Sequence, residues 1–432
     1  MPMRLLKKTL LLTGLALVLC FFLQGKSRAE TAYFDITASG VRKIVVAIPA
    51  FTGSAAGQNN AGTMAAKLIT EGFELYGFLD VIDYGSYGGR KDADWKALGV
   101  DYVVMGLVNG GPSGLTVEAQ FLEVGTNKTL AGRRYSGTSA QLEDMSLRLC
   151  DTLIQDLTGE EGVARTKMAY VSDATGRKEV YVSDVLGNHP KQITKHRALA
   201  VSPRFTPEGN SLAYSSYHHG NQDLYITDLR QDRQTNVISR RPGMNLAPAF
   251  LPDGNMVVTL SVGGNPDLYL LDRKGGIINQ LTSQAGLNVS PSASPDGRFI
   301  AFSSDRSRGG HPKVYLMDLA SRQVSMLQNS VAECSEPSWS PKGDEIAFTG
   351  LVGGSYQIFV CDRNGGNVRQ ITSGGGDFES PTWAPDGRLV AATRKSGGRS
   401  QVCVMDKNGK GVRVLLNMRG NLSFPQWSPR LP

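Results

Sequence analysis

The chain has 432 residues and a formal net charge of +7, but five of its basic residues, and none of its acidic ones, lie within residues 1–29. The rest of the chain holds 41 basic and 39 acidic residues, so its net charge is only +2. This balance, with no cluster of Lys and Arg, excludes the basic surface that nucleic-acid binding needs. About 400 residues beyond the first 29 are enough for two domains.

Residues 1–29 have the pattern of a secretory signal peptide. A basic start precedes an apolar run from Leu10 to Leu23, and Ser27 and Ala29 supply small residues before a cleavage point. The run has 14 residues and is short for a bilayer span, which disfavours the alternative of an uncleaved membrane anchor. We expect the mature chain to begin near Glu30 and to be exported and soluble.

Four cysteines remain after residue 29, and none forms a CxxC motif. Cys150, Cys334, Cys361 and Cys403 are so widely spaced that they indicate neither a zinc site nor a dense disulfide framework. Cys361 and Cys403 occupy equivalent apolar strands of neighbouring repeats, so we expect both to be small core residues.

Residues 30–162 predict an N-terminal α/β domain. Runs of β-branched residues indicate strands, and apolar residues at helical spacing, such as those from Leu142 to Leu153, indicate helices. Gly159 and Gly162 end the last helix and mark the domain boundary. The predicted strands are 41–48, 79–84, 102–108, 115–124 and 129–136, and the predicted helices are 61–75, 92–98 and 139–157.

Residues 163–432 contain two motifs that recur in phase every 43 to 46 residues. One is Pro-x-x-x-Pro-[Asp/Glu/Lys]-Gly, and the other is a short apolar strand that ends in Asp, such as Val180–Asp184. A fixed period of this length, with four short strands in each repeat, predicts the blades of a β-propeller. The proline motif spans Pro203–Gly209, Pro248–Gly254, Pro291–Gly297, Pro337–Gly343 and Pro381–Gly387, with a last copy, Pro425–Pro429, that lacks the glycine.

The two ends of this region predict how the ring closes. Residues 165–195 supply three strands with no proline motif before them, and the last motif has no strands after it. The C-terminal strand therefore completes the first blade, which predicts an all-β six-bladed propeller with no open edge.

The proline motif also predicts local structure. We expect the first Pro to open the innermost strand and Pro-Asp-Gly to form the tight turn into the second strand. Trp339, Trp383 and Trp427 lie between the two prolines, and we expect them to pack one blade against the next.

The sequence contains no evident catalytic motif. It has neither HExxH nor G-x-S-x-G, and its five histidines lie in loops without ligand spacing. A metal could be held by the pair His218–His219 or by a ring of acids in the channel, but turn formation explains the repeated Asp better. We expect no enzymatic activity, cofactor, metal ion or small-molecule substrate.

The segments before each first Pro differ between repeats, whereas the scaffold does not. They lie at one mouth of the propeller channel, where variable side chains on a rigid ring make a binding face; the alternative is that they only solvate the mouth. The side chains that we expect to contact a partner there are Met244, Asn245, Ala247, Asn288, Val289, Ser290, Glu333, Cys334, Glu336, Phe378, Glu379 and Asn421.

This combination resembles the TolB family, the periplasmic propeller proteins of the Tol–Pal system. The resemblance rests on a signal peptide, an α/β domain and a propeller with P-x-W-S-P-D-G and V-Y-V-x-D repeats that stops after Pro425–Pro429. It covers nearly the whole mature chain. It implies a monomeric, non-enzymatic adaptor in the periplasm, within a system for envelope integrity and cell division.

The resemblance also implies two protein partners. A Pal-like peptidoglycan-associated lipoprotein would dock at the propeller mouth, where Met244, Ala247 and Val289 match the family's contact positions. A TolA-like inner-membrane protein would bind the N-terminal segment, about residues 30–41. The residues of that segment expected to contact it are Tyr33, Phe34, Asp35 and Ile36. The residues alone leave two other functions open, a secreted hydrolase or lyase that uses the channel and a sensor of an envelope peptide.

Overall fold

The computed structural model describes residues 42–53, 58–111, 114–230, 234–283, 285–307 and 309–431. The predicted signal peptide and the predicted N-terminal contact residues Tyr33, Phe34, Asp35 and Ile36 lie outside these ranges. Among the described residues, no helix is both long and apolar enough to cross a membrane.

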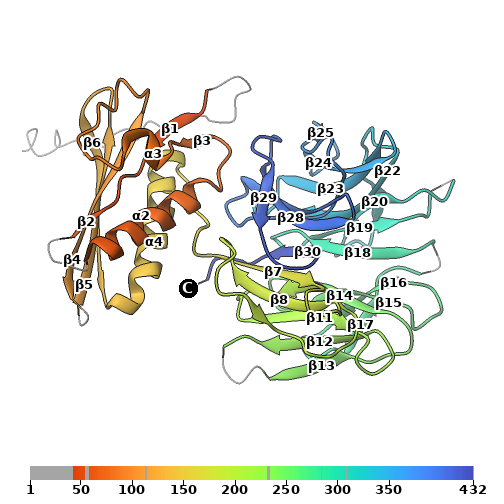
Figure 1. The fold of residues 1–432 in the computed structure, drawn as a ribbon. Helices are drawn as coiled ribbons and strands as arrows, with labels where there is room; N and C mark the ends of the chain where they lie inside the picture. Colours follow the sequence, from red (N-terminus) through yellow and green to blue (C-terminus); the bar gives the residue numbers. More distant parts are fainter. Residues whose placement is uncertain are drawn as a thin grey trace, which may run out of the picture. The chain divides into compact units, whose positions relative to one another are not determined.

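The N-terminal part is a mixed sheet with the strand order β3–β1–β4–β5–β6, and β2 pairs with the end of β4. The two long helices contact each other and lie side by side against one face of this sheet (Figure 1). Alternation along the strands decides which face each side chain takes: Val46 and Val104 pack with the helices, whereas Ala47 and Val103 pack with Trp95 on the opposite face. The strands are β1 (Ile44–Ala47), β2 (Thr52–Gly53), β3 (Leu79–Val81), β4 (Tyr102–Gly111), β5 (Gly114–Glu123) and β6 (Lys128–Gly137). The helices are α2 (Gln58–Phe73), α3 (Tyr84–Tyr87), the 3₁₀ helix η1 (Ser139–Gln141) and α4 (Leu142–Thr158).

These elements confirm the five predicted strands and two of the three predicted helices in order, and they add two elements that were not predicted, β2 and α3. The helix expected at 92–98 is absent, and that segment forms turns around the buried side chain of Trp95. A seven-residue segment is too short to be stable as a helix on its own. The short helix α3 lies earlier in the chain, where Asp83 caps its first turn by accepting a hydrogen bond from the Gly85 N–H.

The second part is a six-bladed propeller, and every blade is a four-stranded antiparallel sheet in the described chain. The first blade has the order β30–β7–β8–β9, so the strand nearest the C-terminus is its innermost strand. This pairing confirms the predicted closure of the ring and leaves no edge at the junction (Figure 1).

The blades follow one another in chain order. The first is β30 (Leu422–Trp427), β7 (Lys167–Ser172), β8 (Glu179–Asp184) and β9 (Lys191–Gln192), and the second is β10 (Ala200–Phe205), β11 (Ser211–Ser216), β12 (Asp223–Asp228) and β13 (Thr235–Ser239). The third is β14 (Asn245–Phe250), β15 (Met256–Leu260), β16 (Asp267–Leu271) and β17 (Ile277–Gln280), and the fourth is β18 (Asn288–Ala293), β19 (Phe299–Ser304), β20 (Lys313–Asp318) and β21 (Val324–Met326). The fifth is β22 (Glu333–Trp339), β23 (Glu345–Val352), β24 (Ser355–Asp362) and β25 (Arg369–Gln370), and the sixth is β26 (Asp377–Trp383), β27 (Leu389–Ser396), β28 (Arg399–Asp406) and β29 (Arg413–Leu416).

The first Pro of each motif does not open the innermost strand, contrary to the prediction. In the fourth blade, for example, β18 begins at Asn288, three residues before Pro291, and the register with β19 shifts between Val289 and Ser292. The same shift occurs in all six innermost strands. The prolines therefore occupy β-bulges, where the missing N–H costs no ladder hydrogen bond.

The other two features of the motif are confirmed. In each of the five full motifs the glycine has a positive φ, and in the fourth blade the Gly297 N–H donates to the Ser294 carbonyl to close the turn (2.9 Å). Between the fifth and sixth blades, the Trp383 indole N–H donates to the Ser338 carbonyl (3.0 Å). Trp383 also packs with Val360 of the fifth blade, so it joins the two blades as expected.

Candidate functional site

The innermost strands place the six pre-proline segments in equivalent positions, so each residue can be described by its distance from the first Pro of its motif. The residues three positions before that Pro are all buried, with at most 2 % of each exposed. They are Ala200, Asn245, Asn288, Cys334, Phe378 and Leu422.

Four of the expected partner contacts belong to this buried set and are corrected here: Asn245, Asn288, Cys334 and Phe378. Their side chains hold the scaffold. The Asn288 amide, for example, donates to the Asp267 carboxylate (2.9 Å) and to the Gly286 carbonyl (2.9 Å). The prediction treated whole segments as surface, whereas the two-residue period of a strand turns every second side chain inward.

One position further from the Pro, the side chains lie at the outer edge of the mouth. We call these six residues the rim: Leu199, Met244, Leu287, Glu333, Asp377 and Asn421. Three consecutive blades contribute apolar rim residues that remain 40 %, 42 % and 47 % exposed, namely Leu199, Met244 and Leu287. The other three rim residues are polar, so the mouth has an apolar half and a polar half.

Exposed apolar residues outside the pre-proline segments extend the apolar half of the mouth. Tyr217 and Val262 follow the second strands of their blades, and each lies next to the rim because these strands are antiparallel to the innermost ones. The Tyr217 N–H donates to the Leu199 carbonyl (3.0 Å), and the Ser261 N–H next to Val262 donates to the Met244 carbonyl (3.2 Å). Neither residue was among the predicted contacts, although the strand pairing within each repeat places them here.

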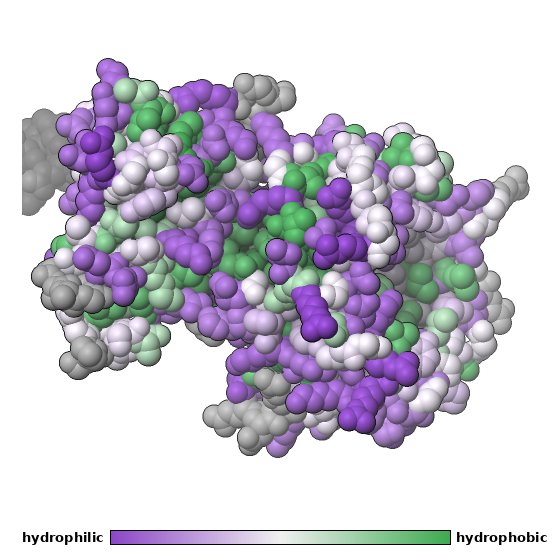
Figure 2. Space-filling view, in the orientation of Figure 1, coloured by the Kyte–Doolittle hydropathy of each residue, from purple (hydrophilic) through white to green (hydrophobic). Residues whose placement is uncertain are grey.

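Hydropathy alone would not have identified this surface. The face of the molecule shown in Figure 2 carries several separate groups of hydrophobic residues among hydrophilic ones. The mouth is distinctive because its exposed apolar residues come from equivalent positions of neighbouring blades and so gather at one end of the channel.

The polar half of the mouth contains three glutamates that are already partnered. His311 pairs with Glu333 (2.7 Å), and Lys395 pairs with Glu379. Glu336 accepts hydrogen bonds from the Ser380 backbone N–H (2.7 Å) and hydroxyl (3.0 Å). These carboxylates surround a cavity of about 380 Å³ between the fourth, fifth and sixth blades.

The remaining expected residues lie between the rim and the channel. Val289 is half-buried, and Ser290 lines the channel. Asn421 is exposed at the rim, and its amide donates to the Asp173 carboxylate (2.9 Å). Ala247 lies in β14, and its side chain is among those that the structure does not describe.

The residue immediately before the first Pro has a left-handed backbone conformation in the five bulges other than that of Ala247, whose side chain the structure does not describe. The residues are Ser202 (φ 53°), Ser290 (54°), Glu336 (50°), Ser380 (55°) and Phe424 (51°). This conformation is unfavourable for residues other than Gly, Asn and Asp, so the blade packing must impose it. Its effect is to turn these side chains toward the channel, which all five line.

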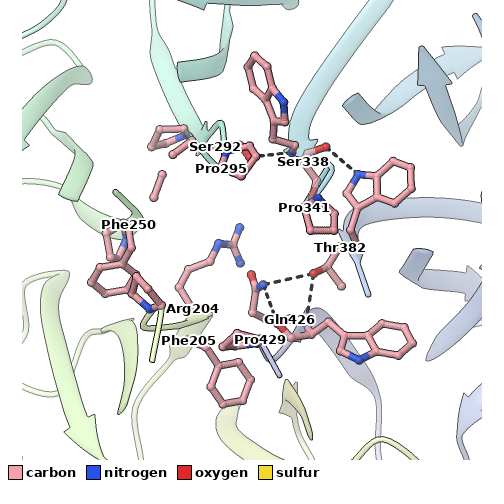
Figure 3. Close-up of a pocket in the computed structure, with 18 of the residues that line it drawn as sticks. Arg204, Phe205, Phe250, Ser292, Pro295, Ser338, Pro341, Thr382, Gln426 and Pro429 are labelled. Atoms are coloured by element: carbon pink, nitrogen blue, oxygen red, sulfur yellow. Dashed lines mark hydrogen bonds between the residues drawn. The ribbon is translucent and has the colours of Figure 1, made fainter. Parts of the chain in front are cut away.

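The channel runs between the innermost strands and has a volume of about 520 Å³. Pairs of prolines from five motifs, and Pro207 from the remaining one, form much of its wall, so the wall has few backbone donors. Figure 3 shows the side chain of Arg204 pointing into the opening, with Gln426 and Thr382 hydrogen-bonded to each other nearby (3.3 Å).

The described residues also contain one group of three side chains whose ligand atoms lie close enough together to hold a metal ion, Glu143, Asp184 and His189. His189 already pairs with Glu143 (3.0 Å), and Asp184 accepts a hydrogen bond from the Asn188 N–H (2.6 Å). Burial raises the pKa of Asp184 to about 6. These partners account for the group as a structural cluster, and it lies outside the mouth.

Comparison with known families identifies the fold and the family. The model of the TolB β-propeller domain matches residues 154–431, and the model of the TolB amino-terminal domain matches residues 32–130. The chain belongs to the TolB family.

Named relatives agree with this assignment. The Tol-Pal system protein TolB of Desulfotalea psychrophila is 43 % identical over 249 residues, which is 57 % of this chain and 57 % of that protein. The Tol-Pal system protein TolB of Desulfosudis oleivorans is 32 % identical over 291 residues, or 64 % of this chain and 65 % of that protein. The matched regions thus span less than two thirds of these relatives.

A solved structure matches over a larger part of the chain. The crystal structure of TolB from Acinetobacter baumannii superposes with a TM-score of 0.80 at 26 % identity and covers 90 % of this chain and 98 % of that one. The α/β part followed by a propeller is therefore an architecture that this chain shares with a solved TolB.

Proposed function

We propose that this protein is a non-enzymatic periplasmic adaptor of the Tol–Pal system. Its propeller mouth binds a Pal-like peptidoglycan-associated lipoprotein, and its N-terminal segment, about residues 30–41, binds a TolA-like inner-membrane protein. Residues 1–29 act as the signal peptide. Membership of the TolB family and the names of the relatives support the system, and the exposed rim supports the location of the first partner.

The observation that carries the proposal is the apolar half of the mouth. Leu199, Met244 and Leu287 keep large apolar side chains in water on three adjacent blades. Contiguous exposed apolar groups of this kind, next to polar groups, mark protein-binding sites. A lipoprotein domain that covered them would bury apolar surface against a rigid ring. Because the ring is already ordered, binding would lose little conformational entropy.

The proposal predicts that charge at the rim disrupts lipoprotein binding. Met244→Arg combined with Leu287→Arg is expected to weaken binding roughly 30-fold to 900-fold, since two anchor residues that the partner buries each contribute on the order of 1–2 kcal/mol. Titration calorimetry with the lipid-free soluble domain of the same organism's lipoprotein measures the change.

A matched control comes from the outer edge of the third blade. Ile277 and Ile278 lie in β17 and are 44 % and 45 % exposed, much like the rim residues. Ile277→Arg with Ile278→Arg adds the same two charges away from the mouth and is expected to leave the affinity unchanged. Equal affinities of the rim variant and the unmodified protein would rule out this face.

A further inference from the structure

Arg204 is the one charged residue among the six side chains that directly follow the first Pro of each motif. The equivalent residues in the other blades are Ala249, Ser292, Ser338, Thr382 and Gln426. All six line the channel, so they form one ring with a single positive charge. The five neutral side chains are small or already hydrogen-bonded, which leaves the guanidinium room inside the opening.

The neutral members of this ring serve the scaffold. The Ser292 hydroxyl accepts a hydrogen bond from the backbone N–H of Trp339 in the next blade (2.9 Å). The Thr382 hydroxyl accepts one from the Trp427 N–H in the same way (3.2 Å). An arginine cannot accept a hydrogen bond, so Arg204 cannot join its blade to the next by this contact. The scaffold therefore gives no reason for a guanidinium at this position.

The guanidinium of Arg204 is also poorly partnered. Among the described residues, its one hydrogen bond goes to the neighbouring Pro203 carbonyl (2.9 Å), although the group carries five donors. No described carboxylate forms an ion pair with it. Burial lowers the pKa of Arg204, and the negative charge of Glu336 raises it from a distance. Glu336 already accepts hydrogen bonds from the Thr349 hydroxyl of its own blade and from the Ser380 N–H of the next blade.

We propose that the channel is a carboxylate-binding site in which Arg204 receives an acidic group from an extended segment of the docked partner. A planar guanidinium binds a carboxylate through two parallel hydrogen bonds, and the prolines of the wall have no backbone N–H that could compete for it. The volume of about 520 Å³ falls within the range of about 300–1,000 Å³ that is usual for ligand sites. The inference rests on the proposed function only for the identity of the partner.

A poorly paired, partly buried charge costs stability in the free protein. If Arg204 serves binding, Arg204→Met should leave the thermal midpoint unchanged or raise it. If Arg204 instead supports the scaffold, the midpoint falls, and that result overturns the proposal. This measurement separates a binding role from a structural role without any ligand.

Short peptides test the site directly and do not depend on the lipoprotein. The probes are acetyl-Gly-Glu-Gly-amide, which carries a side-chain carboxylate, acetyl-Gly-Gly-Gly with a free C-terminus, and acetyl-Gly-Gln-Gly-amide as the neutral control. The readout is the Arg204 side-chain N–H resonance of the ¹⁵N-arginine-labelled protein, assigned by its loss in Arg204→Lys.

We expect at least one carboxylate peptide, and not the neutral one, to shift this resonance in a saturable way. The probe that acts shows whether the site takes an acidic side chain or a chain terminus. The proposal is overturned if neither carboxylate peptide shifts the resonance, or if the neutral peptide shifts it equally.

Binding of the lipoprotein domain then links the site to the partner. Arg204→Gln is expected to weaken that binding at least tenfold, with a partial recovery in Arg204→Lys, whereas Arg363→Gln on an exposed outer turn has no effect. Removal of one partner carboxylate should weaken binding no further in the Arg204→Gln background. Equal affinity of Arg204→Gln and the unmodified protein overturns the inference alone, whereas no binding by the unmodified protein contradicts the proposed function instead.

Discussion

Deletion of residues 421–432 is expected to abolish cooperative folding of the propeller. The deletion removes β30, whose residues Leu422 to Trp427 pair with β7 and close the ring. Trp427 is 2 % exposed, and its indole N–H donates to the Thr166 hydroxyl (2.7 Å). Loss of one such buried Trp alone costs about 3–5 kcal/mol, and the lost ladder adds unpaired groups along β7. The sum approaches the whole stability of a typical protein, about 5–15 kcal/mol.

Thermal unfolding followed by circular dichroism measures this effect. Deletion of residues 431–432, which leaves β30 in place, is the control and should melt close to the full chain. A synthetic peptide of residues 421–432, added to the truncated chain, is expected to restore a cooperative transition because it supplies the missing strand. A truncated chain that melts at the same temperature as the full chain would contradict the role of β30 in closure.

The propeller was predictable because its repeats are strict. Two motifs in phase give the number of blades, and the incomplete first and last repeats show how the ring closes. The pairing of strands that are far apart in the chain therefore followed from the repeats alone. The strands of the α/β part other than β2 were predictable from their apolar periodicity. The helix predicted at 92–98 was wrong: this short segment forms turns in which Trp95 is buried.

The site was only partly predictable, because its geometry depends on the bulges. A residue before Pro favours extended conformations, so the left-handed conformation of Ser290 is unusual. No local sequence pattern predicts it. The bulge changes which side chains reach the channel. Both Met244 and Asn288 were expected at the mouth; Met244 is exposed, whereas Asn288 is buried.

Two signals in the sequence could have given more of the site. Alignment of the six motifs at the first Pro places equivalent residues side by side. The residues three positions before the Pro are buried in the structure, and those four positions before it form the rim. The same alignment shows Arg204 as the one charge in its ring. The exposure of Tyr217 needed the strand pairing in addition, because it lies far from its proline motif in the chain.

Stability is expected to fall as the pH rises from about 4 to about 7, because of one buried carboxyl group. Asp151 lies in α4 and is 3 % exposed. Burial raises the pKa of Asp151 from its ordinary value of 3.8 to about 7, although hydrogen bonds from the Ala164 and Arg165 N–H groups lower it. Between these pH values the folded protein keeps a proton that the unfolded chain has released. Folding is therefore favoured at low pH and loses this contribution as the pH rises through 7.

The difference of about three pH units corresponds to roughly 4 kcal/mol at most. Asp151→Asn has no proton to release, so its free energy of unfolding should lack this pH dependence. The difference in free energy of unfolding between the variant and the unmodified protein should therefore shift in favour of the variant from pH 4 to pH 8. Other buried acids, such as Asp184, are present in both proteins and cancel in the difference. Urea unfolding at several pH values provides the measurement.

The control is Asp144→Asn, which removes an exposed carboxylate from the same helix, where it pairs with Arg165 (3.0 Å). This variant should follow the pH dependence of the unmodified protein. If Asp151→Asn also followed it, Asp151 would have to be ionised in the folded protein throughout this range. Its hydrogen bonds from the Ala164 N–H (2.6 Å) and the Arg165 N–H (3.2 Å) would then outweigh burial. The experiment thus decides which of these two opposing effects is larger where the chain leaves α4 for the propeller.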